Sequence, residues 1–289
     1  MPEASQMIGI WHKESCTMRG LLLTVLALLS LSLQAQDKTP ALITIVSPQI
    51  PWLLDPENPG PYNDLMDELF VGFDQPLQVS ILPVRRAQRE FFDGPALCFY
   101  AGNYDDVYFE TTGIARDSLI ISRPFNVSYI RAFTPARLDT VENIAQAAGQ
   151  NAAVDLSIGA VQLILDALPK SVEPIMASNT LHAHALVSQG RAKTAIMVDY
   201  DYRLFVARHP SKAPLHFHVG LDFGTVEDAV MCKRSDQAAS LIEHINSKTR
   251  SLNADGMLAK ILAPDYERSR RQFAEQPHPY LVTYQPATP

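Results

Sequence analysis

The chain has 289 residues, of which 47% are apolar and 19% charged, a composition typical of a globular protein with one large domain or two lobes. Its formal net charge of −7 argues against general binding to phosphate backbones, so no nucleic-acid partner is expected. The sequence has no P-loop, no G-x-G-x-x-G and no G-x-S-x-G motif, and no cofactor is predicted.

The N-terminal region has the pattern of a secretory signal. Met18 and Arg19 precede the apolar run GLLLTVLALLSLSLQAQ, and Ala35 is a small residue suited to cleavage. We therefore expect 1–36 to comprise an extension and a signal peptide cleaved near Ala35, with Met1 and Met18 both open as the start. The predicted location is the periplasm, and an uncleaved anchor is the alternative.

Strand and helix signals alternate from residue 41 onward. β-Branched apolar runs predict strands, and apolar residues at helical spacing predict helices. The expected strands are 41–47, 77–82, 96–100, 119–121, 127–133, 152–154, 193–198, 216–219 and 226–233; the expected helices are 62–70, 85–92, 138–147, 160–168, 181–189 and 235–249, with a closing helical segment in 252–262. The proline-rich 48–61, 169–174 and the tail 276–289 are expected to be irregular. This alternation is typical of α/β lobes with largely parallel sheets.

The stretch 85–125 has an ordered set of features: a basic helix, Gly94, a strand, Gly102, Arg116 and the motif Ser-x-Pro-Phe at 122–125. This order resembles the first lobe of family 3 extracellular solute-binding proteins, the periplasmic receptors of amino-acid transporters. Three further runs are similar to that family's second lobe and closing helices, in the right order: AVDLSIGAV, LVSQGRAKTAIMVDYDY and SLIEHINSKTRSLNADGMLAKILAPDY.

The resemblance implies the type 2 periplasmic-binding fold, with two α/β lobes, each a mostly parallel sheet flanked by helices, and two hinge crossings. It places 37–130 in lobe 1, 131–220 in lobe 2, 221–275 in the return to lobe 1, and 276–289 in a tail. Receptors of this kind close their lobes over a ligand by a hinge. The implied partners are a small-molecule ligand and a membrane permease, as in an ABC transporter, or a sensor protein, and the protein is expected to be a monomer.

The resemblance also implies six ligand-contacting residues: Trp52, Gly102, Arg116, Ser157, Gly159 and Asp199. An arginine grips a carboxylate bidentately, so Arg116 is expected to hold the ligand carboxylate, and Asp199 its ammonium. Backbone amides at the helix start near Ser157 would add anion donors. The alternatives are loop packing for Trp52, a surface role for Arg116 and helix capping for Asp199. The segment 103–115 is longer than the family spacing, which identifies a divergent member.

Two cysteines follow the signal, Cys98 and Cys232, each in a β-like apolar run. Export permits a disulfide, and in the implied fold the two strands could be neighbours; two buried free thiols are the alternative. Histidines at His182, His184 and His216 lack a carboxylate or cysteine at ligand-like spacing, so no metal site is predicted.

The predicted function is capture of a small anionic or zwitterionic, amino-acid-like solute between the lobes, for transport or sensing, without catalysis. Two alternatives stay open. One is a ligand-poor docking module for a membrane sensor. The other is a dehydratase-like periplasmic enzyme on the same fold, with Asp106 or Glu110 as acid/base beside Arg116. The ligand's identity is not fixed by the sequence.

Overall fold

The computed structural model describes residues 42–103, 109, 114–135, 151–158 and 161–262. All of them belong to the compact unit that begins at Leu42. Within this part of the chain, no helix has the length and apolar character that a bilayer span requires.

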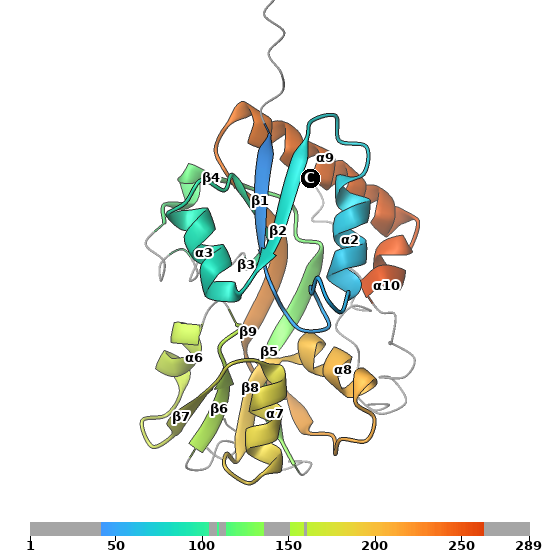
Figure 1. Cartoon of the computed structure of the whole chain (residues 1–289). Helices are drawn as coiled ribbons and strands as arrows, with labels where there is room; N and C mark the ends of the chain where they lie inside the picture. Colours follow the sequence, from blue (N-terminus) through green and yellow to red (C-terminus); the bar gives the residue numbers. More distant parts are fainter. Residues whose placement is uncertain (1–41, 104–108, 110–113, 136–150, 159–160, 263–289) are drawn as a thin grey trace, which may run out of the picture. The chain divides into compact units, whose positions relative to one another are not determined.

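The first lobe begins with a parallel α/β arrangement (Figure 1). Its elements are β1 (Ile43–Pro48), α2 (Pro61–Phe70), β2 (Leu77–Leu82), α3 (Val84–Phe92), β3 (Cys98–Asn103), η1 (Arg116–Ser118) and β4 (Leu119–Ile121). β1 pairs in parallel with β2 on one side and β3 on the other. Pro61 occupies the first helical position of α2, where its missing N–H costs nothing and its fixed φ favours the helix.

The second lobe and the return to the first follow in chain order. The elements are β5 (Asn126–Thr134), β6 (Asn151–Asp155), α6 (Val161–Ala167), β7 (Glu173–Ala177), α7 (Thr180–Ser188), β8 (Thr194–Val198), α8 (Asp199–Arg208), β9 (His216–Lys233), α9 (Asp236–Ala254) and α10 (Met257–Leu262). Side-chain oxygens cap two of these helices: Asn179 accepts from the His182 amide, and Ser235 from the Ala238 amide.

A nine-stranded sheet runs through both lobes in the order β2-β1-β3-β9-β5-β8-β6-β7, with β4 also paired to β9. Its outer parts are parallel, as the sequence predicts, whereas β5 and β9 pair antiparallel at the centre, from Asn126 opposite Asp228 to Thr134 opposite His216. β5 leads into the second lobe and β9 returns from it (Figure 1). The ladder shifts register on either side of Arg131, which marks the crossing as irregular.

Three elements differ from the expectations. Residues 173–177 form the edge strand β7, where a loop was expected to end. Pro174 obscured the short strand signal, but an edge strand tolerates a proline. Asp199–Arg208 is the helix α8, which was not expected; all its residues to Ala207 are buried, so no apolar-polar period marks it. β9 is one strand instead of two. The predicted helix 138–147 lies outside the described residues.

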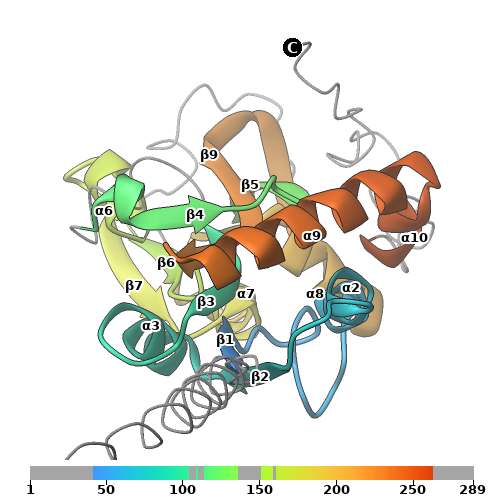
Figure 2. The ribbon, with the colours of Figure 1, turned by 90° about the horizontal axis from the view of Figure 1, so that it is seen from above.

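The main hydrophobic core extends across both lobes. It joins Ile45 of β1 and Leu241 of α9 to Val154 of β6 and Tyr200 of α8. A smaller cluster lies between α3 and β3, so α3 covers the sheet face opposite α2, α9 and α10 (Figure 2). Burial of apolar surface therefore joins the lobes to each other as well as stabilising each one.

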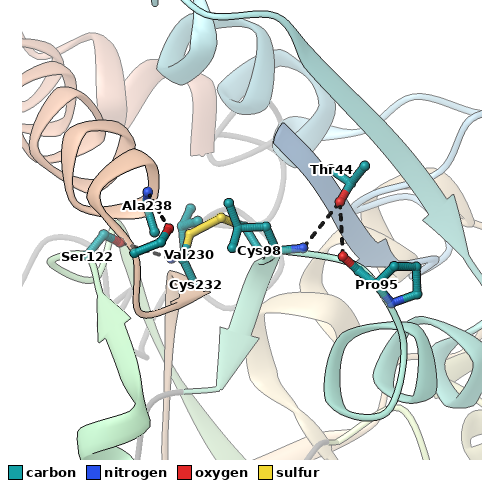
Figure 3. The surroundings of a disulfide bond; sticks show 9 residues. Thr44, Pro95, Cys98, Ser122, Val230, Cys232 and Ala238 are labelled. Carbon is teal, nitrogen blue, oxygen red and sulfur yellow. Dashed lines mark hydrogen bonds between the residues drawn. A yellow bond between two sulfur atoms is a disulfide. The ribbon is translucent and has the colours of Figure 1, made fainter. Parts of the chain in front are cut away.

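A disulfide joins β3 to β9. Cys98 and Cys232 lie directly opposite each other in the antiparallel ladder, are fully buried and are bonded. Figure 3 shows the bridge beside Ser122, whose hydroxyl accepts a hydrogen bond from the Val230 amide. The sequence leaves a disulfide and two buried free thiols as alternatives, and the structure has the disulfide.

Replacing both cysteines with alanine should destabilise the protein. The bridge closes a sequence separation of 134 residues, and loss of a native disulfide typically costs about 2–5 kcal/mol. Urea unfolding of the oxidised wild type and the double variant measures this loss. Reductant should destabilise the wild type and leave the variant unchanged; equal stability of both oxidised proteins would contradict the expectation.

Candidate functional site

The candidate site is a cavity of about 60 Å³ between the two lobes. Its polar lining comes from Gln88 of α3, Ser157 after β6, Asp201 of α8 and Asp228 of β9. A smaller cavity of about 10 Å³ lies next to it, large enough for about one water, and shares Ser157 and Asp201 with the first. Residues from both lobes thus meet around one polar space.

Two residues beside these cavities have left-handed backbones. Ala101, which lines the larger cavity, has φ 59°, and Trp52, which lines the smaller, has φ 64°. Ala101 is the extra residue of a β-bulge in β3, where the register shifts between Tyr100 and Gly102. A non-glycine residue in this region costs about 1–3 kcal/mol and is concentrated at functional sites, which is an independent reason to place the site here.

Asp228 lies buried in the cavity wall and accepts hydrogen bonds from neutral donors. The Tyr62 hydroxyl donates to its Oδ2 at 2.5 Å, and the Asn126 amide donates both to the Tyr62 hydroxyl and to the Asp228 carboxyl. Burial raises the pKa of Asp228 to about 7, although the bonds from Tyr62 and Asn126 act in the opposite direction. Near neutral pH this carboxyl is therefore only partly ionised.

Asp201, in the first turn of α8, is 9% exposed and lines both cavities. Burial raises the pKa of Asp201 well above its ordinary value, and the neighbouring carboxyls of Asp155, Asp228 and Asp199 raise it further. Over the described ranges, no side chain or amide donates a hydrogen bond to its carboxylate. An ionised Asp201 would therefore lack both a counter-charge and a hydrogen-bond donor among the described residues.

Asp155 has its hydrogen-bonding capacity filled. Its Oδ1 accepts from the Ser157 amide at 2.8 Å and the Ser157 hydroxyl at 2.7 Å, and its Oδ2 accepts from the Thr180 hydroxyl at 2.7 Å. Burial nevertheless raises the pKa of Asp155. These hydrogen bonds fix Ser157 at the cavity wall. They also occupy the Ser157 amide, which the sequence predicts as a donor to a ligand anion.

Asp199 is fully buried and makes contacts within the protein. Its Oδ1 accepts from the Tyr129 amide at 3.0 Å, and its Oδ2 lies 3.5 Å from Nε of Arg131. Burial raises the pKa of Asp199, and Arg203 and Arg131 oppose that rise. Asp199 lines neither cavity described above.

Asp201, and not Asp199, lines the cavity, because an advance of two residues along a helix rotates the side-chain direction by about 200°. Sequence reasoning missed Asp201 because α8 was not predicted; an aspartate two places after Asp199 was the available signal.

The other predicted ligand residues have separate surroundings. The ring of Trp52 lies 5.6 Å from that of Phe205 and 4.9 Å from that of His209, so Trp52 joins the first lobe to α8. A Cβ at Gly102 would come within 2.4 Å of the Met231 Cε, which makes this glycine a close-packing position.

Arg116 is exposed in η1, with its guanidinium 5.9 Å from the centroid of the Phe109 ring, and is not among the residues that line the two cavities. Gly159, Asp106 and Glu110 lie outside the described residues. Among the residues that the structure describes, no group of three histidine, cysteine, aspartate or glutamate side chains could hold a metal ion.

Trp52→Ala should destabilise the protein by about 1–3 kcal/mol, because it removes the aromatic contacts with α8. Trp52→Phe is the matched control, since it retains an aromatic ring at the same backbone position. Chemical unfolding of the three proteins gives the comparison. An alanine variant as stable as the wild type would show that the Trp52 contacts with Phe205 and His209 do not stabilise the fold.

Asp228→Asn should stabilise the protein more at pH 8 than at pH 5. The folded pKa of about 7 is above the ordinary carboxyl value, so the folded state holds the proton more tightly and wild-type stability falls as pH rises from about 4 to about 7. An amide is neutral throughout, so the variant escapes this loss, by about 2–3 kcal/mol between pH 5 and pH 8. Urea unfolding at both pH values measures it, and a difference independent of pH would contradict the expectation.

Comparison with known proteins gives a structural match alone. No family model matches the chain, and no curated protein matches it. Three of the similar solved structures are a mutant of ArgBP from T. maritima (15% identity, 78% of this chain and 95% of that one, TM-score 0.58), the L-glutamate complex of the GluR0 ligand-binding core from Nostoc punctiforme (13%, 76% and 96%, 0.60), and the BvgS VFT2 domain from Bordetella pertussis (17%, 81% and 96%, 0.60). Since these likenesses span both lobes, the chain has the two-lobed α/β fold of periplasmic binding proteins.

Proposed function

We propose that this protein is an exported solute-binding protein that captures a small, amino-acid-like solute between its lobes, for transport or sensing. The observation that carries the proposal is the polar cavity, to which Gln88 contributes from the first lobe, Ser157 and Asp201 from the second, and Asp228 from the crossing strand. A solute in this cavity contacts elements on both sides of the crossing. It would therefore favour the closed arrangement over any open one, which is how a binding event becomes a conformational signal.

Similar structures support this proposal at the level of the fold. One is the substrate-binding protein of an amino acid ABC transporter, with 11% identity and a TM-score of 0.58. Binding without turnover is part of the proposal, as are periplasmic location and partnership with a membrane permease or sensor. Of the six predicted ligand residues, Ser157 lines both cavities and Trp52 the smaller. Ligand contact by Gly102, Arg116, Gly159 and Asp199 stays a prediction.

A ligand-poor docking module is the second candidate, and two observations favour it. The cavity of about 60 Å³ is small beside the roughly 300–1,000 Å³ of drug-sized ligand pockets. In addition, Tyr200 of α8 contacts Tyr62 of the first lobe and donates a hydrogen bond to the Leu262 carbonyl of α10. Such contacts can hold the lobes together without a solute, which suits a domain that docks on a sensor.

Gln88→Trp separates these two functions. The larger side chain would fill the cavity, so we expect it to abolish any increase in melting temperature that amino acids, small amines or small carboxylic acids give the wild type. Arg89→Trp, at an exposed position of the same helix, is the matched control and should retain the response. Absence of any response in the wild type would contradict solute binding and favour the docking module. A response that survives in Gln88→Trp would contradict this cavity as the binding site.

A further inference from the structure

The four buried carboxyls at the lobe junction differ in how they are neutralised. The Arg131 guanidinium lies within ion-pair distance of Asp199. Asp155 is saturated by the hydroxyls of Ser157 and Thr180 and by one amide. Asp228 accepts bonds from the neutral groups of Tyr62 and Asn126.

Asp201 is the exception among these carboxyls: within the described part of the chain it has neither a cation nor a hydrogen-bond donor, although it is nine-tenths buried. Burying a carboxylate without a partner is unfavourable, and protein structures avoid it unless a ligand or a proton completes the group. Because Asp201 lines both cavities, its missing partner would have to lie in them.

Among its described lining residues, the cavity has no positively charged side chain to receive an anion. Its lining includes the two carboxyls of Asp201 and Asp228 and the neutral polar groups of Gln88 and Ser157; the described lining residues include no lysine, arginine or histidine. When these two carboxyls are ionised, they repel an added carboxylate and attract a cation, and the low dielectric of a buried site strengthens both effects.

The geometry favours an ammonium over a larger or flat cation. An ammonium has three N–H donors, which match Asp201, Asp228 and the Ser157 hydroxyl or Gln88 amide oxygen. The remaining wall is apolar and includes Ile158, with room for a short alkyl chain. A volume of about 60 Å³ corresponds to roughly four to six water-sized positions, which limits the occupant to a few heavy atoms.

We propose that the solute is a small primary amine, a cation without its own carboxylate, whose ammonium is held between Asp201 and Asp228. This inference rests on the proposed capture of a solute between the lobes, and it replaces the amino-acid-like class of that solute with a primary amine. The family resemblance implies an anionic or zwitterionic solute because it assigns Arg116 to a carboxylate, whereas Arg116 is not among the residues that line these cavities. At a pH where Asp228 is partly protonated, entry of the ammonium would favour release of that proton.

The test uses the full chain and four probes of similar size: propylamine, ethanolamine, glycine and propionate. We expect both amines to raise the melting temperature, glycine to do so weakly and propionate not at all. Asp201→Asn should weaken amine binding at least about tenfold, since it replaces a charge-assisted bond by a neutral one. Asp166→Asn, which removes an exposed carboxylate from α6, is the matched control and should bind as the wild type does.

A second measurement on the wild type avoids dependence on any variant. Asp201 faces carboxyls from β6 (Asp155), β9 (Asp228) and its own helix (Asp199), so proton loss and amine binding should be coupled there. Because the pKa of Asp228 is about 7, amine affinity should rise by up to about tenfold per pH unit below pH 7 and level off above it, with proton release detectable by calorimetry in buffers of different ionisation enthalpy.

The outcomes separate the two proposals. If propionate or glycine binds more tightly than the amines, and Gln88→Trp abolishes that binding, solute binding stands and the amine class is wrong. Amine affinity that is unchanged in Asp201→Asn and independent of pH would also overturn the amine site. If none of the probes and no amino acid binds, both the ligand class and the solute-binding function fail.

Discussion

The antiparallel pairing of β5 with β9 is the interaction on which the site depends. It places Asn126 opposite Asp228, so that both can meet Tyr62 of α2, and it continues past Arg131 into the second lobe. Because these two strands belong to both lobes, their register sets which first-lobe residues face which second-lobe residues. A shift by one residue would turn Asp228 to the opposite face of the sheet and remove one wall of the cavity.

The buried carboxyls at this crossing reduce the stability of the fold, because burying charged groups is unfavourable, and they fix the positions of neighbouring elements. A core of this size could have been filled with apolar side chains at lower free energy. Instead, α8 begins with Asp199 and Asp201 on different sides of the helix. Asp199 binds the Tyr129 amide and thereby attaches α8 to β5, which orients Asp201 toward the cavity. One carboxyl fixes the helix so that the other can face the cavity.

Much of the frame could be predicted from local pattern. The β-branched run of β1, the helical spacing in α2 and the Ser235 cap of α9 each fix their element without long-range information. The α/β character follows from the alternation of strand and helix signals, whereas the order of the two lobes and the periplasmic-binding fold are implied by the family resemblance. The site was harder to predict, because Asp201 lies on a helix that is buried on all sides and therefore has no periodic pattern of apolar residues. Nor can a single sequence show that the Ser157 amide is already used by Asp155, since that contact depends on a turn geometry.

The bridge between Cys98 and Cys232 makes the second lobe an insertion within a covalent ring, because β6, α6, β7, α7, β8 and α8 all lie between the two cysteines in sequence. A protease that cuts one peptide bond anywhere in that interval opens the chain but releases no fragment, and the two pieces stay attached through sulfur. A cut in the second lobe would therefore leave the first-lobe frame covalently continuous and able to hold the cut ends near each other.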